Sequence, residues 1–555
     1  MAVEKSIAQL LDTPQEMEIE IETADEEQLP LFESDDTIML EDGSAIVGYM
    51  EEEENISGDF FANLTEEMED EELGELSSEL ISSYKDDLES RQDWLEQYTN
   101  GLDLLGIKTD DREEPFRGAS GVYHPLIAES ATQFQAGAYK ELLPPGGPTQ
   151  TRIIGEETEE VIAQAERVRN YMNFMVLDVM EEFDPETDQM LFYLPLSGST
   201  FKKTYFDPTL NRPVSKFVMP DDLVVSYTES SLASSPRFTH VVNMNLNDVR
   251  KLQVSGFYRD IELFPDDTDD VDDAKDKIQE LTGFRRNIQG ADSVTLLEMH
   301  VDLDLPGYED KDEDGEETGI AIPYIVTIHE ESNEILAIRR NYRQDDLKKS
   351  KIRYFTHYKF LPGLGFYGFG LIHMIGGLTK SATSILRQLI DAGTLANLPA
   401  GFKARGLRVR DEDLPLQPGE FRDVDAPGSS IREAIMPLPY KEPSATLLQM
   451  LGVLIESGRR FASVTDINVG EGSQANPVGT TIALLEQGTK VLSAIHKRLH
   501  YAQRQELRIL AEVIKNYLPP EYPYRVPGGI DSGVKVDDFD DRIDILPVSD
   551  PAMFS

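Results

Sequence analysis

The segment Gly363-Leu-Gly365-Phe-Tyr-Gly368 has the residue types and spacing of a dinucleotide-binding turn. In such a turn, glycines let the backbone approach a pyrophosphate at a helix start, and an acid about 20 residues later binds the ribose. The first acid after this segment, Asp391, falls inside a predicted helix instead of at the end of a second strand. We therefore expect a flexible turn before a helix, and a nucleotide-dependent oxidoreductase is the alternative.

A second candidate is Asp310-Lys-Asp312-Glu-Asp314-Gly315, which matches the first half of an EF-hand calcium loop. The last ligand of that loop must be a bidentate glutamate, and the residue at that place is Ala321. We expect an acidic hairpin turn here. A metal-dependent phosphoesterase that uses residues 310–317 is the alternative.

His496 and His500 have the one-turn spacing of a zinc-binding pair on a helix. The glutamate of an HExxH motif is missing, and Lys497 and Arg498 lie between the histidines. Local positive charge disfavours a divalent cation, so we expect these histidines to be satisfied by other side chains or by solvent.

Other catalytic motifs do not occur in the sequence. Gly377-Leu-Thr-Lys380-Ser381 lacks the glycine that precedes the lysine of a P-loop, and there is no GxSxG nucleophile elbow. The chain has no cysteine, which excludes a thiol nucleophile, a disulfide framework and a cysteine-based zinc site. We expect no enzymatic activity, no cofactor and no bound metal.

These segments fall in a chain whose pattern predicts an α+β fold, with helices first and strands after them. The first helix is predicted over residues 84–105 and ends at Gly106, which is a favourable helix stop. Further helices are predicted at 124–143, 158–183, 371–398, 444–466 and 477–518, and strands at 198–206, 223–227, 238–244, 293–303, 323–329 and 334–341.

The charge is strongly negative and unevenly distributed. Among 555 residues there are 104 acids and 51 lysines and arginines, a net charge of -53. The first 90 residues hold 30 acids but only Lys5 and Lys85 as bases. We expect residues 1–89 to form an acidic, largely disordered arm, in which residues 29–32 and 38–40 are candidate apolar anchors. Residues 339–410 are basic instead, with 14 lysines and arginines against three acids.

The two ends of the sequence and its hydropathy lead to further expectations. The first residues show no basic region followed by an apolar run, and no apolar stretch approaches the ~18 residues of a membrane span. We expect a soluble chain of roughly two to four domains, without a membrane partner. Asp550-Pro551 has the pattern of a helix start, so we expect the natural chain to continue.

The long helix predicted at 477–518 carries a basic stripe. Five of the helix's lysines and arginines fall within a sector of about 40° when successive residues are placed 100° apart. They are Lys490, Lys497, Arg504, Arg508 and Lys515. The stripe is either a solvated helix face or a surface that faces phosphate or an acidic neighbouring subunit.

Two local motifs and the order of elements resemble the portal proteins of tailed bacteriophages, of the podovirus and related myovirus type. The motifs are Phe116-Arg-Gly-Ala-Ser-Gly-Val-Tyr-His-Pro-Leu-Ile-Ala-Glu-Ser-Ala-Thr-Gln-Phe-Gln135 and Lys140-Glu-Leu-Leu-Pro-Pro-Gly-Gly-Pro148. The order is a helix and strand block, a helix after Gly365-Phe-Tyr-Gly368-Phe-Gly370, a small insert, a returning helix, a glycine-rich loop and a long helix. The resemblance covers Ser90 to the end of the chain.

The resemblance implies a homo-oligomeric ring, usually a dodecamer, at one capsid vertex of the virion, assembled in the host cytoplasm. Double-stranded DNA would pass through it during packaging and ejection without sequence-specific contacts. The implied protein partners are the terminase large subunit, a tail adaptor, and the major capsid or scaffold protein. An acidic adaptor without a channel is the remaining alternative.

Segment by segment, the resemblance implies a wing at 90–365, a stem helix at 366–398, a clip at 399–443, a second stem helix at 444–468, a tunnel loop at 469–476, the long helix, and the start of a crown at 519–555. The tunnel-loop residues near DNA would be Gly470, Glu471, Gly472, Ser473, Gln474, Ala475 and Asn476. The clip docking surface would include Lys403, Arg405, Arg408 and Arg410. Acidic walls and a loop of small, mostly neutral residues fit a conduit in which DNA slides.

Overall fold

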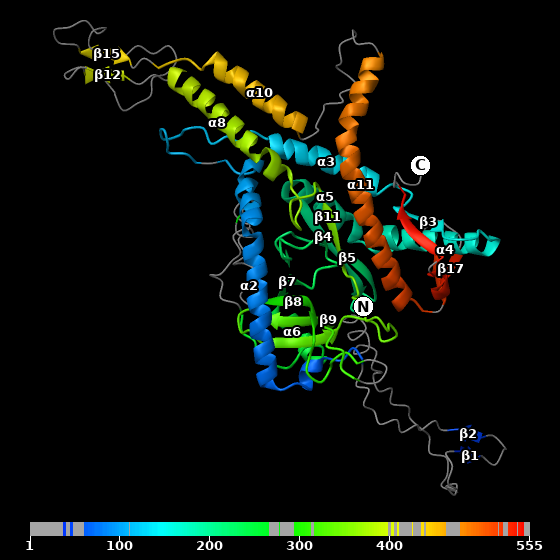
Figure 1. Ribbon diagram of the computed structural model, residues 1–555. Helices are drawn as coiled ribbons and strands as arrows, with labels where there is room; N and C mark the ends of the chain where they lie inside the picture. The colour runs from blue at the N-terminus through cyan, green and yellow to red at the C-terminus, as the bar shows by residue number, and fades with distance from the viewer. Residues whose placement is uncertain are drawn as a thin grey trace, which may run out of the picture.

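The computed structural model describes residues 60–109, 111–265, 277, 293–311, 316–397, 440–461, 478–519, 521–525, 531–540 and 542–548, with short strand segments elsewhere. Those segments are β1 (Thr37–Met39), β2 (Ala45–Val47), β12 (Gly401–Lys403), β13 (Arg408–Val409), β14 (Val424–Asp425) and β15 (Ile435–Pro437). The described chain is mainly helical from residue 70 to 197 and mainly β-stranded from 199 to 359, and the fold class is α+β, as predicted (Figure 1).

A five-stranded antiparallel sheet forms the lower part of the body in Figure 1. Its strand order is β10 (Ile335–Arg340), β9 (Ile322–His329), β8 (Ser293–Leu303), β7 (Arg237–Asn245) and β6 (Leu223–Val224). Side chains alternate between its two faces, as the strand period requires. In β10 a register shift between Ile335 and Ala337 interrupts this alternation. Ile335 and Ile338, three positions apart, therefore both pack toward α2 (Asp70–Gly101), whereas Leu336 packs toward α6 (Leu246–Val254).

Helix α2 corrects the expectation that residues 1–89 form a largely disordered arm. The described chain begins at Phe60, passes through the short helix η1 (Leu64–Glu66), and enters α2 at Asp70. Leu73, Leu80 and Tyr84 are buried against the five-stranded sheet. Residues 60–89 are therefore structural, because apolar side chains at helical spacing outweigh the local negative charge.

The helices after α2 follow the predicted order but not all the predicted bounds. α2 ends through η2 (Leu102–Leu105) at Gly106, whose φ of 68° is a left-handed helix stop. α3 spans Leu126–Leu142, close to its prediction. The helix predicted at 158–183 is instead α4 (Glu159–Phe174) followed by a π-helical turn, η3 (Met175–Val179).

A further helix, α5 (Phe183–Ser197), was not predicted. The pattern from 158 onward was interpreted as one helix, whereas the chain leaves helical geometry at Met180, where ψ is 76°. Pro185 stands in the first turn of α5, where a missing N–H costs nothing. α5 supports a three-stranded sheet of β11 (Phe355–Lys359), β4 (Ser199–Asp207) and β5 (Arg212–Val218).

The C-terminal residues return to the body. β16 (Glu521–Arg525) and β17 (Asp531–Lys535) form a hairpin, η5 (Val536–Asp538) follows, and β18 (Ile543–Pro547) pairs antiparallel with β3 (Thr149–Ile153). Together with α4 they bury a shared apolar cluster against α11 (Val478–Tyr517). The sequence was interpreted as turn-rich after 519, and these strands were missed. Residues 549–555, which include the predicted helix start, lie outside the described residues.

Candidate functional site

A helical hairpin projects from the body of the molecule. α8 (Leu371–Asn397) runs outward, α10 (Ala445–Phe461) returns beside it, and the strands β12 and β15 lie beyond its far end (Figure 1). Ile385 and Leu451 are buried between the two helices. At the base, Gly458 packs closely on α3, and Arg459 pairs with Glu129 at 3.0 Å. The hairpin is thus anchored to the body at its base. α8 matches its predicted bounds within a residue, and α10 begins one residue after the predicted start, while residues 462–466 of that prediction lie outside the described residues.

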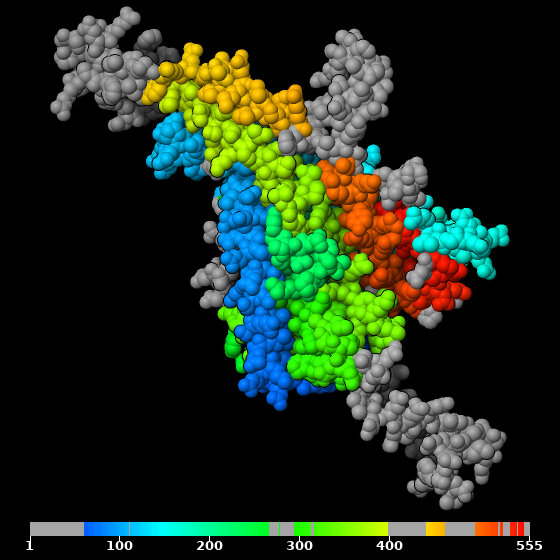
Figure 2. All heavy atoms as spheres, in the orientation of Figure 1, coloured from blue at the N-terminus to red at the C-terminus, as the bar shows by residue number. Residues whose placement is uncertain are grey.

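The outward flanks of this hairpin carry exposed apolar side chains. The exposed fractions are 62% for Leu448, 52% for Met450 and 65% for Val453 on α10, and 39% for both Met374 and Ile390 on α8. Figure 2 shows the hairpin extending from the upper part of the body, and the segment before α3 bonds to one side of α8 through Ser120 and Asp391 and through Val122 and Arg387. Burying such side chains against another protein would remove apolar surface from water, so these positions are candidates for a protein–protein contact.

Two of the five residues of the basic stripe on α11 bind an acid of the same chain. Arg504 and Arg508 pair with the carboxylate of Asp544 on β18, at 2.5 Å and 2.6 Å. Arg152 of β3 pairs with the same carboxylate at 3.0 Å. Burial disfavours the charge on Asp544, but Arg508 and Arg504 hold the pKa of its carboxyl below the usual value. These arginines tie α11 to the β3–β18 pair.

The other basic residues of the stripe differ from these two. Lys497 and Lys515 are exposed, and neither pairs with an acid within the described residues. The side chain of Lys490 lies outside the described part of α11. The predicted role of the stripe toward DNA or a neighbouring subunit stays a prediction, and Lys497 and Lys515 are its available members.

The two histidines of α11 share one carboxylate from the end of α3. His500 Nε2 lies 2.9 Å from Glu141 Oε1, and His496 pairs through Nδ1 with the other oxygen. Burial acts to raise the pKa of Glu141, but the hydrogen bonds from the histidines lower it to about 2. Within the described residues, no group of three or more His, Asp or Glu side chains is arranged to hold a metal ion. The histidines connect α11 with α3.

A buried ion pair that was not predicted joins α11 to the three-stranded sheet. Lys202 Nζ on β4 lies 2.9 Å from Glu506 Oε1, and the two side chains are 0% and 2% exposed. Ser215 donates to Glu506 at 2.6 Å, Tyr358 donates to its other oxygen, and Lys202 also reaches Thr187 at 2.9 Å. Burial, followed by the nearby carboxylate, raises the pKa of Tyr358 well above its ordinary value. Both charges are therefore paired and hydrogen-bonded.

One feature of the sequence indicates that Glu506 belongs to a buried pair. Glu506 falls among Leu499, Leu510 and Val513 on the apolar side of α11 when the helix is drawn at 100° per residue. A carboxylate on a buried helix face requires a partner. The partner itself comes from a strand about 300 positions earlier.

The glycine segment that resembles a dinucleotide-binding turn is closely packed. A Cβ at Gly363 would lie 1.9 Å from the carbonyl oxygen of Tyr367, and one at Gly368 would lie 2.4 Å from that of Gly198. Trp94 Nε1 donates to the Gly368 carbonyl at 2.9 Å. Backbone atoms thus fill the space that a pyrophosphate would need. A turn before α8 is confirmed, but its glycines serve close packing and not flexibility.

The partial EF-hand segment is engaged at its first residue. Asp310 accepts a hydrogen bond from Thr318 Oγ1 at 2.6 Å and pairs with Lys349. Lys311 and Glu317 form an antiparallel bridge, as in a hairpin. Residues 312–315 lie outside the described residues. The first potential calcium ligand is therefore occupied by a lysine of the same chain.

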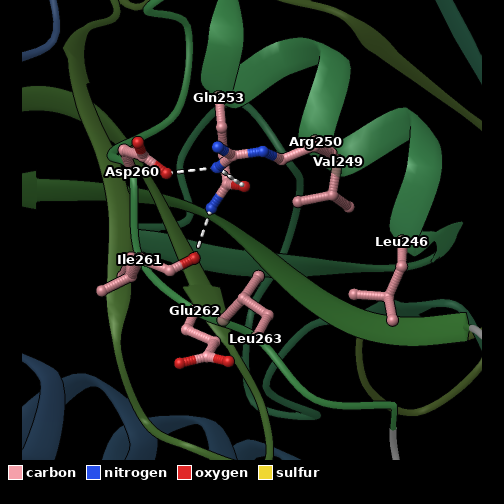
Figure 3. A pocket seen from close by; sticks show the side chains of 8 residues that line it. All are labelled: Leu246, Val249, Arg250, Gln253, Asp260, Ile261, Glu262 and Leu263. Carbon is pink, nitrogen blue, oxygen red and sulfur yellow. Dashed lines mark hydrogen bonds and ion pairs between the residues drawn. The ribbon is translucent and has the colours of Figure 1, made fainter.

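A pocket of about 450 Å³ lies between α6 and the segment that follows it (Figure 3). Arg250 and Asp260 form an ion pair across it, and Gln253 Nε2 donates to the Ile261 carbonyl at 2.7 Å. Leu246 and Val249 contribute apolar lining. Because these polar groups bind one another, we assign no ligand to this pocket.

The predicted tunnel-loop residues, 470–476, lie outside the described residues, as do Arg405 and Arg410 of the clip surface. Lys403 and Arg408 belong to β12 and β13, and the structure describes their backbone but not their side chains. These assignments stay predictions.

No model of a known protein family matches the chain, and no curated protein is significantly similar to it. Among the helices of the described residues, none is long and apolar enough to cross a membrane.

Proposed function

We propose that this chain is the subunit of a tailed-phage portal, a ring at one capsid vertex through which DNA enters and leaves the virion. The observation that carries the proposal is the projecting α8–α10 hairpin, whose flanks expose Leu448, Met450 and Val453. In a ring, two different faces of neighbouring copies meet at each interface. The hairpins of neighbouring copies would then cover one another's apolar flanks and line a stem.

The proposal also assigns a role to each of the following elements. α8 and α10 are the stem helices, residues 399–443 form the clip at their far end, and α11 stands behind the tunnel loop. The terminase large subunit and then a tail adaptor dock at the clip, and the major capsid or scaffold protein surrounds the ring. The ring assembles in the host cytoplasm, usually from twelve copies.

The negative net charge of the chain supports a channel through which DNA passes, and it does not support a surface that holds DNA tightly. A duplex binds tightly where many lysines and arginines neutralise its phosphates. A net charge of -53 opposes such binding over most of the surface. We assign no catalytic step and no cofactor to the chain: it supplies a channel, and the separate terminase hydrolyses ATP.

A charge placed on the exposed flank of α10 tests this assignment. Val453→Asp should convert the assembled form to single subunits or small oligomers, because a buried, unpaired carboxylate would then face the neighbouring copy. The thermal unfolding of the subunit should change little, because Val453 is 65% exposed within the chain. Light scattering coupled to gel filtration measures the mass.

Gln449→Asp is the matched control, since Gln449 is exposed on the same helix and already polar. This variant should assemble like the parent chain. If Val453→Asp assembles equally well, the hairpin flank does not form the subunit interface.

A further inference from the structure

A groove with an apolar floor and charged walls lies where α11 meets β3 and β18. Its volume is about 340 Å³. Phe539 and Ile545 form part of the floor, and Ile154, at the rim, is 53% exposed. Arg508 and Lys515 stand along the α11 side. The groove therefore offers an apolar surface next to cations.

The groove lining itself holds three bases and three acids, but cations outnumber carboxylates once Arg152, Arg504 and Arg542, which pair with two of these acids, are counted. The single carboxylate of Asp544 is shared by three arginines. Lys515 pairs with no acid in the described part of the chain, whereas Arg343 pairs with Glu512 at 3.8 Å. Asp540, which also borders the groove, is already paired with Arg542. An acidic and partly apolar segment would complement this surface.

The described chain begins next to the groove. The ring of Phe60 lies 5.5 Å from that of Tyr342, and Arg340 Nη1 donates to the Phe60 carbonyl at 2.9 Å. The next residue after Tyr342 is Arg343, which lines the groove. Phe60, from which the continuously described chain begins, therefore lies near the rim.

The sequence of residues 1–59 suits the groove. They contain 19 acids and a single base, Lys5. Within them, Leu29-Pro-Leu-Phe-Glu-Ser-Asp-Asp36 places apolar residues directly before acidic ones. The β1–β2 hairpin brings Thr37 beside Val47, so the reach comes from the chain between Val47 and Phe60, which can span up to about 43 Å when extended.

We propose that residues 29–36 occupy this groove of their own chain. Leu31 and Phe32 cover Ile154 and the apolar floor, and the acids that follow face Lys515 and Arg508. This role of the acidic segment goes beyond the proposed portal function and does not require a ring.

The chain has no cysteine, so two introduced thiols can be followed without background. The test variant is the full chain with Phe32→Cys and Ile154→Cys. The control combines Phe32→Cys with Val254→Cys, at a position that is 76% exposed on α6. Under mild oxidation, we expect the test pair to form its intramolecular disulfide about tenfold faster than the control, because docking raises the local thiol concentration.

A charge exchange provides an independent test. Lys515→Glu, added to the variant with Phe32→Cys and Ile154→Cys, should slow cross-linking about threefold, and adding Asp35→Lys should restore the rate, since the attraction is electrostatic. Thermal unfolding of the reduced variants checks that each one folds. A bismaleimide linker repeats the comparison without the geometric demands of a disulfide.

Equal rates for the test and control pairs, with both reagents, would overturn the proposal. A disulfide that forms only between chains would also overturn it, because another copy's segment would then be the occupant. Either result leaves the ring proposal standing, since that proposal depends on the α8–α10 hairpin.

Discussion

At the scale of single residues, the Lys202–Glu506 pair fixes how α11 meets the three-stranded sheet. Removing two charges from water costs several kcal/mol per ion, and only good geometry with further hydrogen bonds offsets this cost. Ser215, Tyr358 and Thr187 supply those bonds. The pair is therefore sensitive to the loss of either partner.

Glu506→Gln should lower the free energy of unfolding by about 3 kcal/mol, because Lys202 would be left buried without a counter-charge. Glu512→Gln is the matched control on the same helix: its carboxylate is 55% exposed and makes only a 3.8 Å contact. The control should change the unfolding free energy by less than about 0.5 kcal/mol. Urea unfolding measures both values, and equally small changes would show that the pair is not buried in solution.

Glu141 gives the chain a pH-dependent link between α3 and α11. Its pKa is lowered from 4.5 to about 2 in the folded chain. A lowered carboxyl pKa contributes stability that is complete above the unfolded value and is lost as the pH falls toward the folded value. We expect Glu141→Gln to be less stable than the parent at about pH 6, with the difference shrinking between about pH 4.5 and 2. Thermal unfolding across this range measures the difference, and a constant difference would contradict the assignment.

Some of these residues can be recognised from the sequence alone, and others cannot. Glu506 is recognisable because a charge falls on the apolar side of a helix, although its partner is not. The sharing of Asp544 by Arg152, Arg504 and Arg508 depends on β18 returning to β3. Local pattern contains no information on such a distant pairing, so the arginines were interpreted as a surface stripe.

At the scale of elements, α2 has the strongest unrecognised signal. Its buried residues are spaced alternately four and three apart along 26 positions, a period of 3.5 that suits one continuous helix face. They are Leu73, Ser77, Leu80, Tyr84, Asp87, Arg91, Trp94 and Tyr98. Many acidic residues lie between these positions, and for that reason the segment up to residue 89 was interpreted as disordered. Periodicity was the better guide there than net charge.

Leu80→Ala should test the structural role of this N-terminal half. Leu80 is 3% exposed against the five-stranded sheet, so truncation should lower the unfolding free energy by about 2 to 4 kcal/mol. Its exposed neighbour, Glu79→Ala, should change it by less than about 0.5 kcal/mol. Similar, small effects in urea unfolding would mean that this part of α2 does not pack on the sheet.

Apart from α2, long elements with regular patterns were predicted closely, whereas several short or interrupted elements were missed. β8 and the hairpin helix α8 match their predicted bounds within a residue. α5 was missed because the π-helical turn at 175–179 hides the break before it. β16 to β18 were missed because strands of five residues among prolines and glycines carry little periodic signal.

At the scale of the whole molecule, the division of charge shapes the proposed function. The first 59 residues hold 19 of the acids, and α2 continues the acidic run on the body. Basic residues gather instead at 339–410 and on one side of α11. A ring of such subunits would present acidic walls with local cations, a distribution that lets a duplex slide.

Deleting Gly472 to Asn476 should leave ring assembly intact and impair the retention or passage of DNA. The predicted tunnel loop is small, mostly neutral and placed before α11, so its proposed contacts are with the moving duplex and not with the core. An in vitro packaging reaction with the purified ring and terminase measures DNA uptake, and electron microscopy measures assembly. Normal packaging combined with failed assembly would show that the loop has another role.

The most direct test of the portal proposal is a negative-stain image of the purified full chain, with its mass measured in parallel at several salt concentrations. The proposal predicts a ring with a central hole and a mass that is a fixed multiple of the subunit. A stable single subunit at high protein concentration under every salt condition would contradict it.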